Sequence, residues 1–264
     1  MANAMIGRGP VMRWLERQYR RLATGFAFAC VFLGGSVIAT VMLPPLALFP
    51  GDQRRRAQWI IRTAFTFYLL MLRFLRLIRL EVSGGERLRH ARGRIIIANH
   101  PSLLDVVILM MLTPDAQCII KHQLWANRYL GALMRRAGYI RNDLEPAELI
   151  EACRRSLASG ANLIIFPEGS RSAPGSALRF QRGFANIATL TEAAIQPVVI
   201  TCTPPTLLRG EKWWAVPEVC PVFRVVVPAV VDASSYINYR YRSMASRKLV
   251  DRMEEFYAQQ LGHA

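Results

Sequence analysis

An unbroken apolar run near the start of the chain is the strongest hydrophobic feature of the sequence. Residues 22–43 carry no formal charge, and Pro44 and Pro45 end the run. As a helix, this stretch would extend about 33 Å, close to the roughly 30 Å hydrocarbon core of a bilayer. It is too long for the apolar region of a signal peptide, and no small-residue cleavage site follows it. We therefore predict a membrane-associated helix, with a buried helix of a soluble core as the alternative.

A second helix with an amphipathic pattern is predicted from the arginines at residues 54–56 to about residue 80. At 100° per residue, one side of this helix, about a third of its circumference, is basic. The basic positions are Arg55, Arg62, Arg73, Arg76 and Arg79. The apolar positions opposite are Ile60, Phe67, Met71, Phe74 and Ile78. This pattern is typical of a helix in the headgroup region, with its arginines reaching anionic phosphates. The alternative is the solvated charged face of an ordinary domain helix.

Basic residues flank the apolar run on both sides, with five arginines among residues 8–21 and three more at residues 54–56. Because basic flanks remain on the cytoplasmic side of a membrane, one full span cannot satisfy both ends. We therefore predict a membrane-associated helical hairpin over residues 1–82. It would be a monotopic or re-entrant anchor on the cytoplasmic face of the inner (cell) membrane. A second domain would cover residues 83–264.

After the linker Ser83-Gly84-Gly85, short apolar segments alternate with helical patterns. Strands are predicted at residues 94–98, 117–121, 162–166, 197–201 and 223–227. Helices are predicted at residues 102–112, 123–137, 146–159, 183–192 and 241–260. This alternation predicts an α/β sandwich around a mostly buried sheet.

The net charge of the 264-residue chain is +16, which indicates an anionic partner. Charge alone leaves nucleic acid and an anionic lipid surface both open. The five cysteines include no C-x-x-C pair, and the four histidines have no metal-ligand spacing. We therefore expect free thiols in a reducing compartment and no bound metal.

The first chemical motif follows the apolar segment at residues 95–97 and reads Asn99-His100-Pro101-Ser102-Leu103-Leu104-Asp105. Pro101 suits the first residue of a helix, which would place Asp105 about one turn inside it. The Asp105 carboxylate could then reach one imidazole nitrogen of His100 and leave the other as a base. The spacing alone is weak evidence, but α/β sites open at the carboxyl ends of strands.

The second motif, Phe166-Pro167-Glu168-Gly169-Ser170-Arg171-Ser172, also follows an apolar segment. A glycine-containing loop that carries a fork-shaped guanidinium is a plausible phosphate binder. A structural turn with a surface salt bridge is an equally good interpretation of this motif alone.

Together the two motifs resemble the conserved blocks of glycerolipid acyltransferases. N-H-P-S-L-L-D resembles the family's H-x-x-x-x-D block, and F-P-E-G-S-R-S resembles its phosphate-binding block, in which threonine is commoner than Ser170. Residues 138–141, 180–183 and 195–200 resemble further blocks in family order. The resemblance covers roughly residues 80–230 and implies an acyltransferase-type sandwich with a mixed central sheet flanked by helices.

The resemblance also implies a reaction. His100 and Asp105 would be the catalytic pair that transfers an acyl chain from a thioester to a lysophospholipid. The acceptor would be 1-acyl-glycerol-3-phosphate and the product phosphatidic acid. The donor would be acyl carrier protein or coenzyme A thioester, a substrate rather than a cofactor. The expected acceptor-binding residues are Lys121, Arg141, Glu168, Gly169, Ser170 and Arg171. Arg141 follows Tyr139-Ile140 directly, whereas many members place this arginine slightly later, after an aspartate.

Four rival interpretations would account for parts of the sequence. A relative with the same chemistry could acylate another lyso-lipid, which an acceptor panel would reveal. A non-catalytic protein that binds anionic membranes would explain the charge but not an intact His–Asp pair beside E-G-S-R. A nucleic-acid binder is disfavoured, because the basic helix adjoins a membrane-length apolar run and no reading motif is present. A serine hydrolase is also disfavoured, because the sequence contains no G-x-S-x-G.

Overall fold

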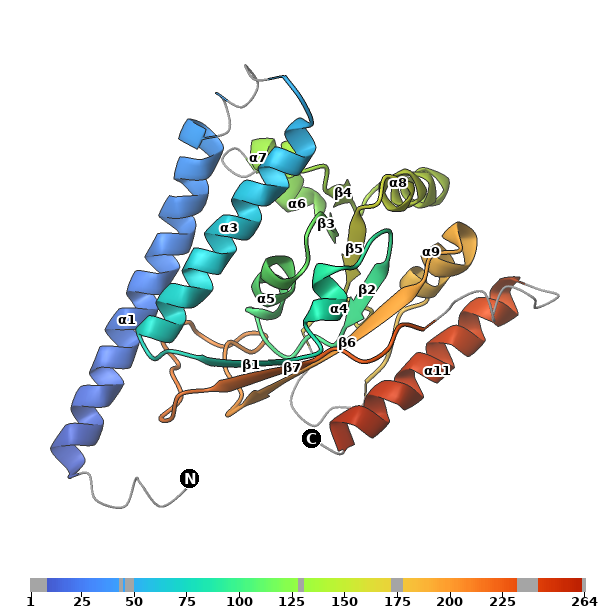
Figure 1. Ribbon diagram of the computed structural model, residues 1–264. Coiled ribbons are helices and arrows are strands. Elements are labelled where there is room, and N and C mark those ends of the chain that lie inside the picture. The colour runs from blue at the N-terminus through green and yellow to red at the C-terminus, as the bar shows by residue number, and fades with distance from the viewer. Residues whose placement is uncertain are drawn as a thin grey trace.

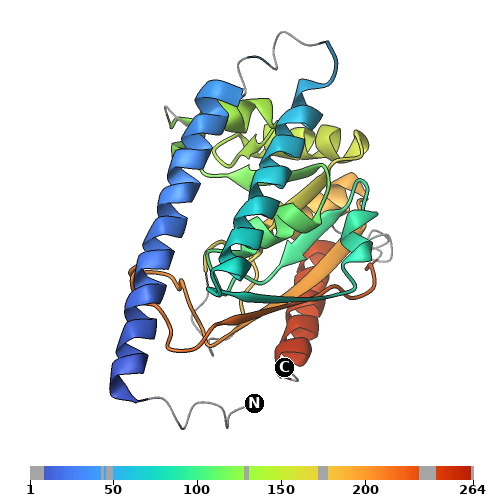
Figure 2. The same cartoon turned by 60° about the vertical axis from the view of Figure 1, so that its left-hand side comes forward.

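The chain folds into a long helical hairpin beside an α/β domain in the computed structural model (Figure 1). The structure describes residues 9–42, 45, 50–127, 131–171, 178–231 and 242–262. Helix α1 (Pro10–Val37) continues through a π-helical turn, η2 (Ile38–Met42). Helix α3 (Gln53–Phe74) returns alongside it, as both views show (Figures 1 and 2). The predicted hairpin is therefore present, although Leu43, Pro44 and residues 46–49 lie outside the described residues.

The two helices of the hairpin differ in how they contact the domain. Leu69 and Leu72 of α3 are buried, and Gln58 of α3 donates from Nε2 to the Ala137 carbonyl at 2.8 Å. In contrast, only 11% of the most apolar 18-residue window of α1 and η2 is buried, and the helix is long and apolar enough to cross a membrane. The outward faces of both helices carry large exposed apolar side chains: Leu22, Phe26, Phe32 and Leu33 of α1, and Trp59, Phe67, Leu70 and Phe74 of α3.

The predicted extent of the second helix is wrong at its carboxyl end. The helix stops at Phe74, and Arg76 has a left-handed φ of 52° that turns the chain into the sheet. Strand β1 (Arg79–Ser83) follows, so the predicted domain boundary after residue 82 falls inside this strand. Arg76 and Arg79 therefore do not extend the arginine stripe, because both lie beyond the helix.

Seven strands form one mixed sheet in the order β1-β7-β6-β2-β5-β3-β4. Their bounds are β2 (Ile95–Ala98), β3 (Ala116–Ile120), β4 (Ile140–Arg141), β5 (Asn162–Ile165), β6 (Ile195–Thr203) and β7 (Val222–Val226). All neighbouring pairs are parallel except β6 with β7. The five predicted strands are present, and the predicted mixed sheet is confirmed. The pattern missed β1 and the two-residue β4.

Helices cover both faces of the sheet. One face packs against α3, α5 (Asp105–Leu112) and α7 (Gly131–Arg136), and the other packs against α8 (Pro146–Ala158), α9 (Gly183–Thr191) and α11 (Arg242–Gly262). Along β2, Ile96 and Ala98 belong to the first core, whereas Ile95 and Ile97 belong to the second. This alternation follows from the two-residue period of a strand and explains why β2 is apolar throughout.

Two predicted helices begin or divide differently in the structure. Helix α5 begins at Asp105 rather than at residue 102, with Leu104 as its N-cap, so Pro101 lies in the turn before it. The helix predicted over residues 123–137 is described as α6 (His122–Trp125) and α7, with residues 128–130 outside the described ranges. The short helix α4 (Glu86–Arg89) between β1 and β2 was not predicted.

Tyr257 of α11 ties the second helical layer to the strand that precedes His100. Its buried hydroxyl accepts from the Val198 amide at 3.1 Å and lies 2.7 Å from the Ile97 carbonyl oxygen. Tyr257→Phe leaves these backbone groups without that partner, so we expect a loss of about 1–3 kcal/mol in the free energy of unfolding. Thermal unfolding in detergent measures it. Tyr19→Phe, which removes an exposed hydroxyl bonded to the Leu75 carbonyl, should cost less than about 0.5 kcal/mol. Equal losses in the free energy of unfolding for the two variants would contradict the role of Tyr257 in joining α11 to the sheet.

Candidate active site

The two sequence motifs meet at one edge of the sheet because their strands are parallel neighbours. Strands β2 and β5 pair with Ile97 opposite Ile165, so the residues that follow them emerge side by side. His100 begins the loop after β2, and Glu168 lies in the loop after β5. The carboxyl edge of a parallel sheet is where α/β proteins place their sites. The structure thus brings together two segments that are 68 residues apart along the chain.

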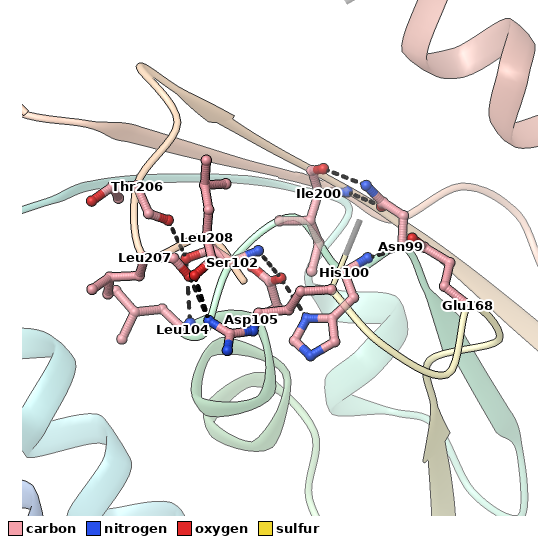
Figure 3. A network of polar contacts seen from close by, with 11 residues as sticks. Asn99, His100, Ser102, Leu104, Asp105, Glu168, Ile200, Thr206, Leu207 and Leu208 are labelled. Carbon is pink, nitrogen blue, oxygen red and sulfur yellow. Dashed lines mark hydrogen bonds and ion pairs between the residues drawn. The ribbon is translucent and has the colours of Figure 1, made fainter. Parts of the chain in front are cut away.

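Asn99 fixes the point at which the chain leaves β2 (Figure 3). Its buried side chain donates from Nδ2 to the Ile200 carbonyl at 2.7 Å and accepts from the Ile200 amide at Oδ1 at 2.8 Å. Both amide atoms are therefore satisfied by one residue of β6. This clamp, which the sequence analysis did not identify, positions the backbone of the next residue, His100.

His100 and Asp105 form the predicted pair. His100 Nδ1 lies 2.9 Å from Asp105 Oδ2, which also accepts from the Ser102 amide at 2.7 Å. The Asp105 side chain is fully buried and that of His100 is 14% exposed. Burial raises the pKa of the Asp105 carboxyl, and the hydrogen bonds from His100 and Ser102 oppose that rise. An acceptor at Nδ1 assigns the ring proton to that nitrogen, which leaves Nε2 with a lone pair.

Phe166 holds the plane of the His100 ring. The two rings are stacked with centroids 4.2 Å apart and an interplanar angle of 26°. Because Phe166 directly follows β5, this contact again depends on the parallel pairing of β2 and β5. The imidazole is thus fixed by a carboxylate at Nδ1 and by an aromatic ring on one face.

Glu168 supports the backbone of His100. Its Oε1 accepts from the His100 amide at 2.8 Å, while its buried Oε2 has no hydrogen-bond partner among the described residues. Burial raises the pKa of the Glu168 carboxyl, and the hydrogen bond from the His100 amide opposes this rise. The second oxygen is therefore a hydrogen-bond acceptor that no described residue uses.

Gly169 is required by the shape of the loop. Its φ of +72° lies in the left-handed region, and a Cβ at this position would come within 2.3 Å of Gln181 Nε2. Ser170 and Arg171 follow, whereas Ser172 lies outside the described residues. The glycine therefore allows the loop to turn from Glu168 toward Arg171.

A loop after β6, Pro204 to Glu211, joins the two motifs and was not predicted. From the second motif, Arg171 donates from Nη1 to the carbonyls of Leu207 and Leu208 at 2.8 and 3.1 Å (Figure 3). On the other side, Ser102 Oγ donates to the Thr206 carbonyl at 3.0 Å. The loop also brings Arg209 Nη1 within 3.3 Å of Ser170 Oγ. Two guanidinium groups therefore lie at the second motif, of which the sequence indicated only Arg171.

Lys121 directly follows β3, and Arg141 is the last residue of β4, so both lie on the same edge of the sheet. Lys121 is exposed. Arg141 donates from Nε and Nη2 to Asp143 at 2.9 and 2.7 Å, which lowers the pKa of Asp143 to about 2. Three strand spacings separate β4 from β2, or about 14 Å. The structure therefore places Arg141 at the far end of this edge, where its guanidinium is bound to the Asp143 carboxylate.

An apolar pocket opens beside the pair. It lies between α1, α3 and the loops around β6 and β7, and Leu104, Thr206 and Leu207 form its wall nearest the active site. The remaining walls include Ala27, Phe28, Tyr68, Leu72 and Trp213. The hairpin and the α/β domain thus enclose an apolar space next to Asp105. Within the described ranges, no three His, Cys, Asp or Glu side chains are arranged to hold a metal ion.

Fold and site together define an α/β protein with an oriented histidine base and a basic loop at the carboxyl edge of its sheet. Residues 79–201 match the model of the family described as Acyltransferase. Residues 79–201, just under half of the chain, therefore contain an acyltransferase domain.

Several curated proteins are similar to this chain. It is 35% identical over 133 residues to a 1-acyl-sn-glycerol-3-phosphate acyltransferase of Limnanthes alba. The aligned region covers 48% of this chain and 46% of that protein. It is 34% identical over 114 residues to the protein of the same name in Helicobacter pylori strain J99, which covers 41% and 48% of the two chains. The chain thus spans about half the length of these relatives.

A solved structure shares the fold. The crystal structure of the 1-acyl-sn-glycerophosphate (LPA) acyltransferase PlsC from Thermotoga maritima matches with a TM-score of 0.67 and 22% sequence identity. The match covers 92% of this chain and 97% of that chain.

Proposed function

We propose that the protein is an O-acyltransferase that moves an acyl chain from a thioester to the free hydroxyl of a lysophospholipid. The acceptor is 1-acyl-glycerol-3-phosphate and the product is phosphatidic acid, the reaction for which the curated relatives are named. The observation that carries the proposal is the fixed His100 ring. Its Nδ1 is bound to a buried carboxylate, and its Nε2 is left to act as a base beside a basic loop.

The reaction follows from this geometry. His100 Nε2 removes the acceptor hydroxyl proton while the oxygen attacks the thioester carbonyl carbon. Asp105 stabilises the resulting imidazolium. When the tetrahedral intermediate collapses, the carbon–sulfur bond breaks and the imidazolium returns the proton to the thiolate. The products are a lipid ester and a free thiol, and no covalent enzyme intermediate forms.

The acceptor headgroup would bind at the basic loop. Arg171 offers a guanidinium already held in place by two carbonyls, and Arg209 adds a second. Lys121 approaches from β3, and Arg141 contributes positive charge from the far end of the edge. Glu168 Oε2 would accept a hydrogen bond from a glycerol hydroxyl, with Gly169 and Ser170 shaping the loop. The apolar pocket beside Leu104, of about 50 Å³, has room for only a short part of an acyl chain.

The acyl donor is acyl carrier protein or coenzyme A thioester. Purified protein assayed with several lysophospholipids against both donors tests the donor and the acceptor together. Transfer to a different lyso-lipid alone would change the assigned acceptor within the same chemistry. No transfer with any pair would favour a non-catalytic protein that binds anionic membranes.

The hairpin is proposed to anchor the enzyme to one leaflet on the cytoplasmic face. Helix α3 packs along the domain, so the hairpin lies beside the domain (Figure 2). The outward apolar side chains of the hairpin are exposed. This arrangement favours a monotopic anchor over a re-entrant one, because α3 is held by Leu69, Leu72 and Gln58. A lipid acceptor then reaches the site from the same membrane surface.

His100→Ala removes the general base, so we expect kcat to fall by roughly 10²–10⁴-fold. Binding of the lysophospholipid should largely survive, because the headgroup contacts remain. Single-turnover acyl transfer measures the first and equilibrium binding the second. His90→Ala, in an exposed histidine outside the site, is the control. Near-normal turnover in folded His100→Ala protein would refute the mechanism.

Arg171→Ala should raise the acceptor KM more than it lowers kcat, since the guanidinium binds the headgroup rather than the reacting atoms. Arg171→Lys should not restore the contact, because an ammonium group lacks the planar fork. Steady-state kinetics with the acceptor varied give both constants, and thermal unfolding reports any loosening of the loop after β6. Arg155→Ala on α8 is the matched control. An unchanged KM in both variants would place the headgroup nearer Lys121 and Arg141.

Apolar contact should hold the protein on the membrane through a high-salt wash, because salt screens charges but not apolar insertion. Detergent should release it. Phe32→Glu with Leu33→Glu places charges on the exposed face of α1, each costing about 2–3 kcal/mol in hydrocarbon, and should shift protein to the soluble fraction. Met244→Glu on α11 is the control. Retention of the double variant would show that this face of α1 does not enter the bilayer.

A further inference from the structure

The arginine stripe of α3 meets a pocket that the catalytic site does not use. This pocket, of about 410 Å³, lies between α3, the end of α5 and the turn before β3. Its charged and aromatic lining comprises Arg55, Arg56, Arg62, Arg92, Asp115 and Trp59. Helix α5 runs from Asp105 at the active site to Leu112 beside the pocket, a length of about 12 Å. The pocket therefore lies at the amino-terminal edge of the sheet, opposite His100.

The lining is strongly basic. Four arginines face one aspartate, which leaves a formal charge of +3. Asp115 Oδ2 lies 3.7 Å from Arg55 Nε and 3.6 Å from Arg92 Nη1, so the carboxylate bridges two guanidinium groups at long distance. Arg62 is held in place by a 3.0 Å hydrogen bond from Nε to the Met111 carbonyl. Arg55 Nε also lies 3.5 Å from Asp52 Oδ2, so Arg55 is shared by two carboxylates. The arginines still outnumber the carboxylates around the pocket and offer several N–H donors to one space, as an anion site requires.

Two buried polar atoms in the pocket wall lack partners. Thr113 Oγ1 and Gln58 Oε1 make no hydrogen bond among the described residues, and Thr113 and Gln58 are only 1% and 6% exposed. Native structures rarely leave buried polar atoms unsatisfied. Gln58 Nε2 donates to the Ala137 carbonyl, which leaves Oε1 as an acceptor. The pocket therefore offers an acceptor at Gln58, a hydroxyl at Thr113 and surrounding cations.

We propose that this pocket binds the headgroup of an anionic glycerophospholipid. The phosphate would meet Arg55, Arg62 and Arg92 and accept from the Thr113 hydroxyl, while a headgroup hydroxyl would donate to Gln58 Oε1. The lipid source follows from Trp59, which lines the pocket and is 66% exposed on the outward face of α3, near Phe67 and Leu70. Tryptophan is typical of the membrane interface, and the apolar face of α3 would take the acyl chains.

This site is separate from the acceptor site, because Asp105 and Thr113 lie at opposite ends of α5. Its occupant bridges α3 to the α/β domain through Arg55 and Arg62 on one side and Arg92 and Thr113 on the other. A bound lipid would therefore fasten the membrane-facing helix to the sheet.

The test measures binding of dioleoyl phosphatidylglycerol to purified full-length protein in neutral detergent by native mass spectrometry. The variants are made in an Arg171→Ala background, which disables the proposed acceptor site. Lipid binding at the pocket is then measured separately from binding at the acceptor site. Adding Arg55→Gln and Arg92→Gln should weaken binding on the order of 10–100-fold, since charge-assisted hydrogen bonds are lost. Arg252→Gln, in an arginine of similar exposure on α11, should leave it unchanged. Equal losses in both variants, or no loss in either, would overturn the proposal.

Thr113→Val separates a ligand site from a structural defect. It replaces an unpartnered hydroxyl by a methyl of similar size, so the melting temperature of lipid-free protein should rise by about 2–4 °C. Affinity for phosphatidylglycerol should nevertheless fall several-fold. Unchanged affinity would overturn the role of Thr113 in the site. Displacement of the lipid by soluble glycerol 3-phosphate at equal concentration would overturn the assignment to a lipid.

Discussion

The parallel pairing of β2 with β5 is the constraint on which the active site depends. It places the Glu168 carboxylate at the His100 amide and the Phe166 ring on the imidazole, although these residues belong to distant segments. Asn99 adds β6 to the same point through two hydrogen bonds to Ile200. The loop after β6 then reaches back to Ser102 and Arg171. Each element that positions the His100 ring is therefore held by its place in the sheet. The geometry of the site thus depends on the strand order.

Local patterns predicted the parts of the fold that local forces determine. The apolar segments at β2, β5 and β6 are long enough to indicate buried strands, and each motif directly follows one of them. The end of α3 at Phe74 was not predicted, because the sequence remains apolar and basic to residue 80. The pairing of β1 with β7 places residues 79–83 in a strand rather than in the helix. The contacts of Arg141 with Asp143 and of Arg209 with Ser170 depend on loop geometry that no periodicity encodes.

The sequence, with its net charge of +16, also could not show which basic side chains contact the domain. A helical wheel treats every arginine of α3 as facing outward, because it contains no neighbouring domain. In the structure, Arg55 and Arg62 contact Asp115 and the Met111 carbonyl, while the apolar residues of the opposite face, Phe67 and Phe74, are exposed. The face of α3 toward the domain is apolar, with Ile60, Ile61, Leu69 and Leu72 buried, while Arg55 and Arg73 are exposed. Apolar side chains therefore lie on both the inner and the outer side of α3, as suits a helix between a protein and a bilayer.

The two helices of the hairpin are held by the α/β domain to different extents. Helix α3 is fastened by buried leucines and by polar contacts to the domain, so it can keep its place in water. Helix α1 buries little of its apolar surface in the protein. Its Tyr19 hydroxyl donates a hydrogen bond to the Leu75 carbonyl, just after α3. Apolar side chains gain stability only when they leave water. In the proposed membrane-bound state, lipid would therefore supply much of the free energy that holds α1 in place. Lipid would thereby also stabilise the pocket wall that Ala27 and Phe28 form.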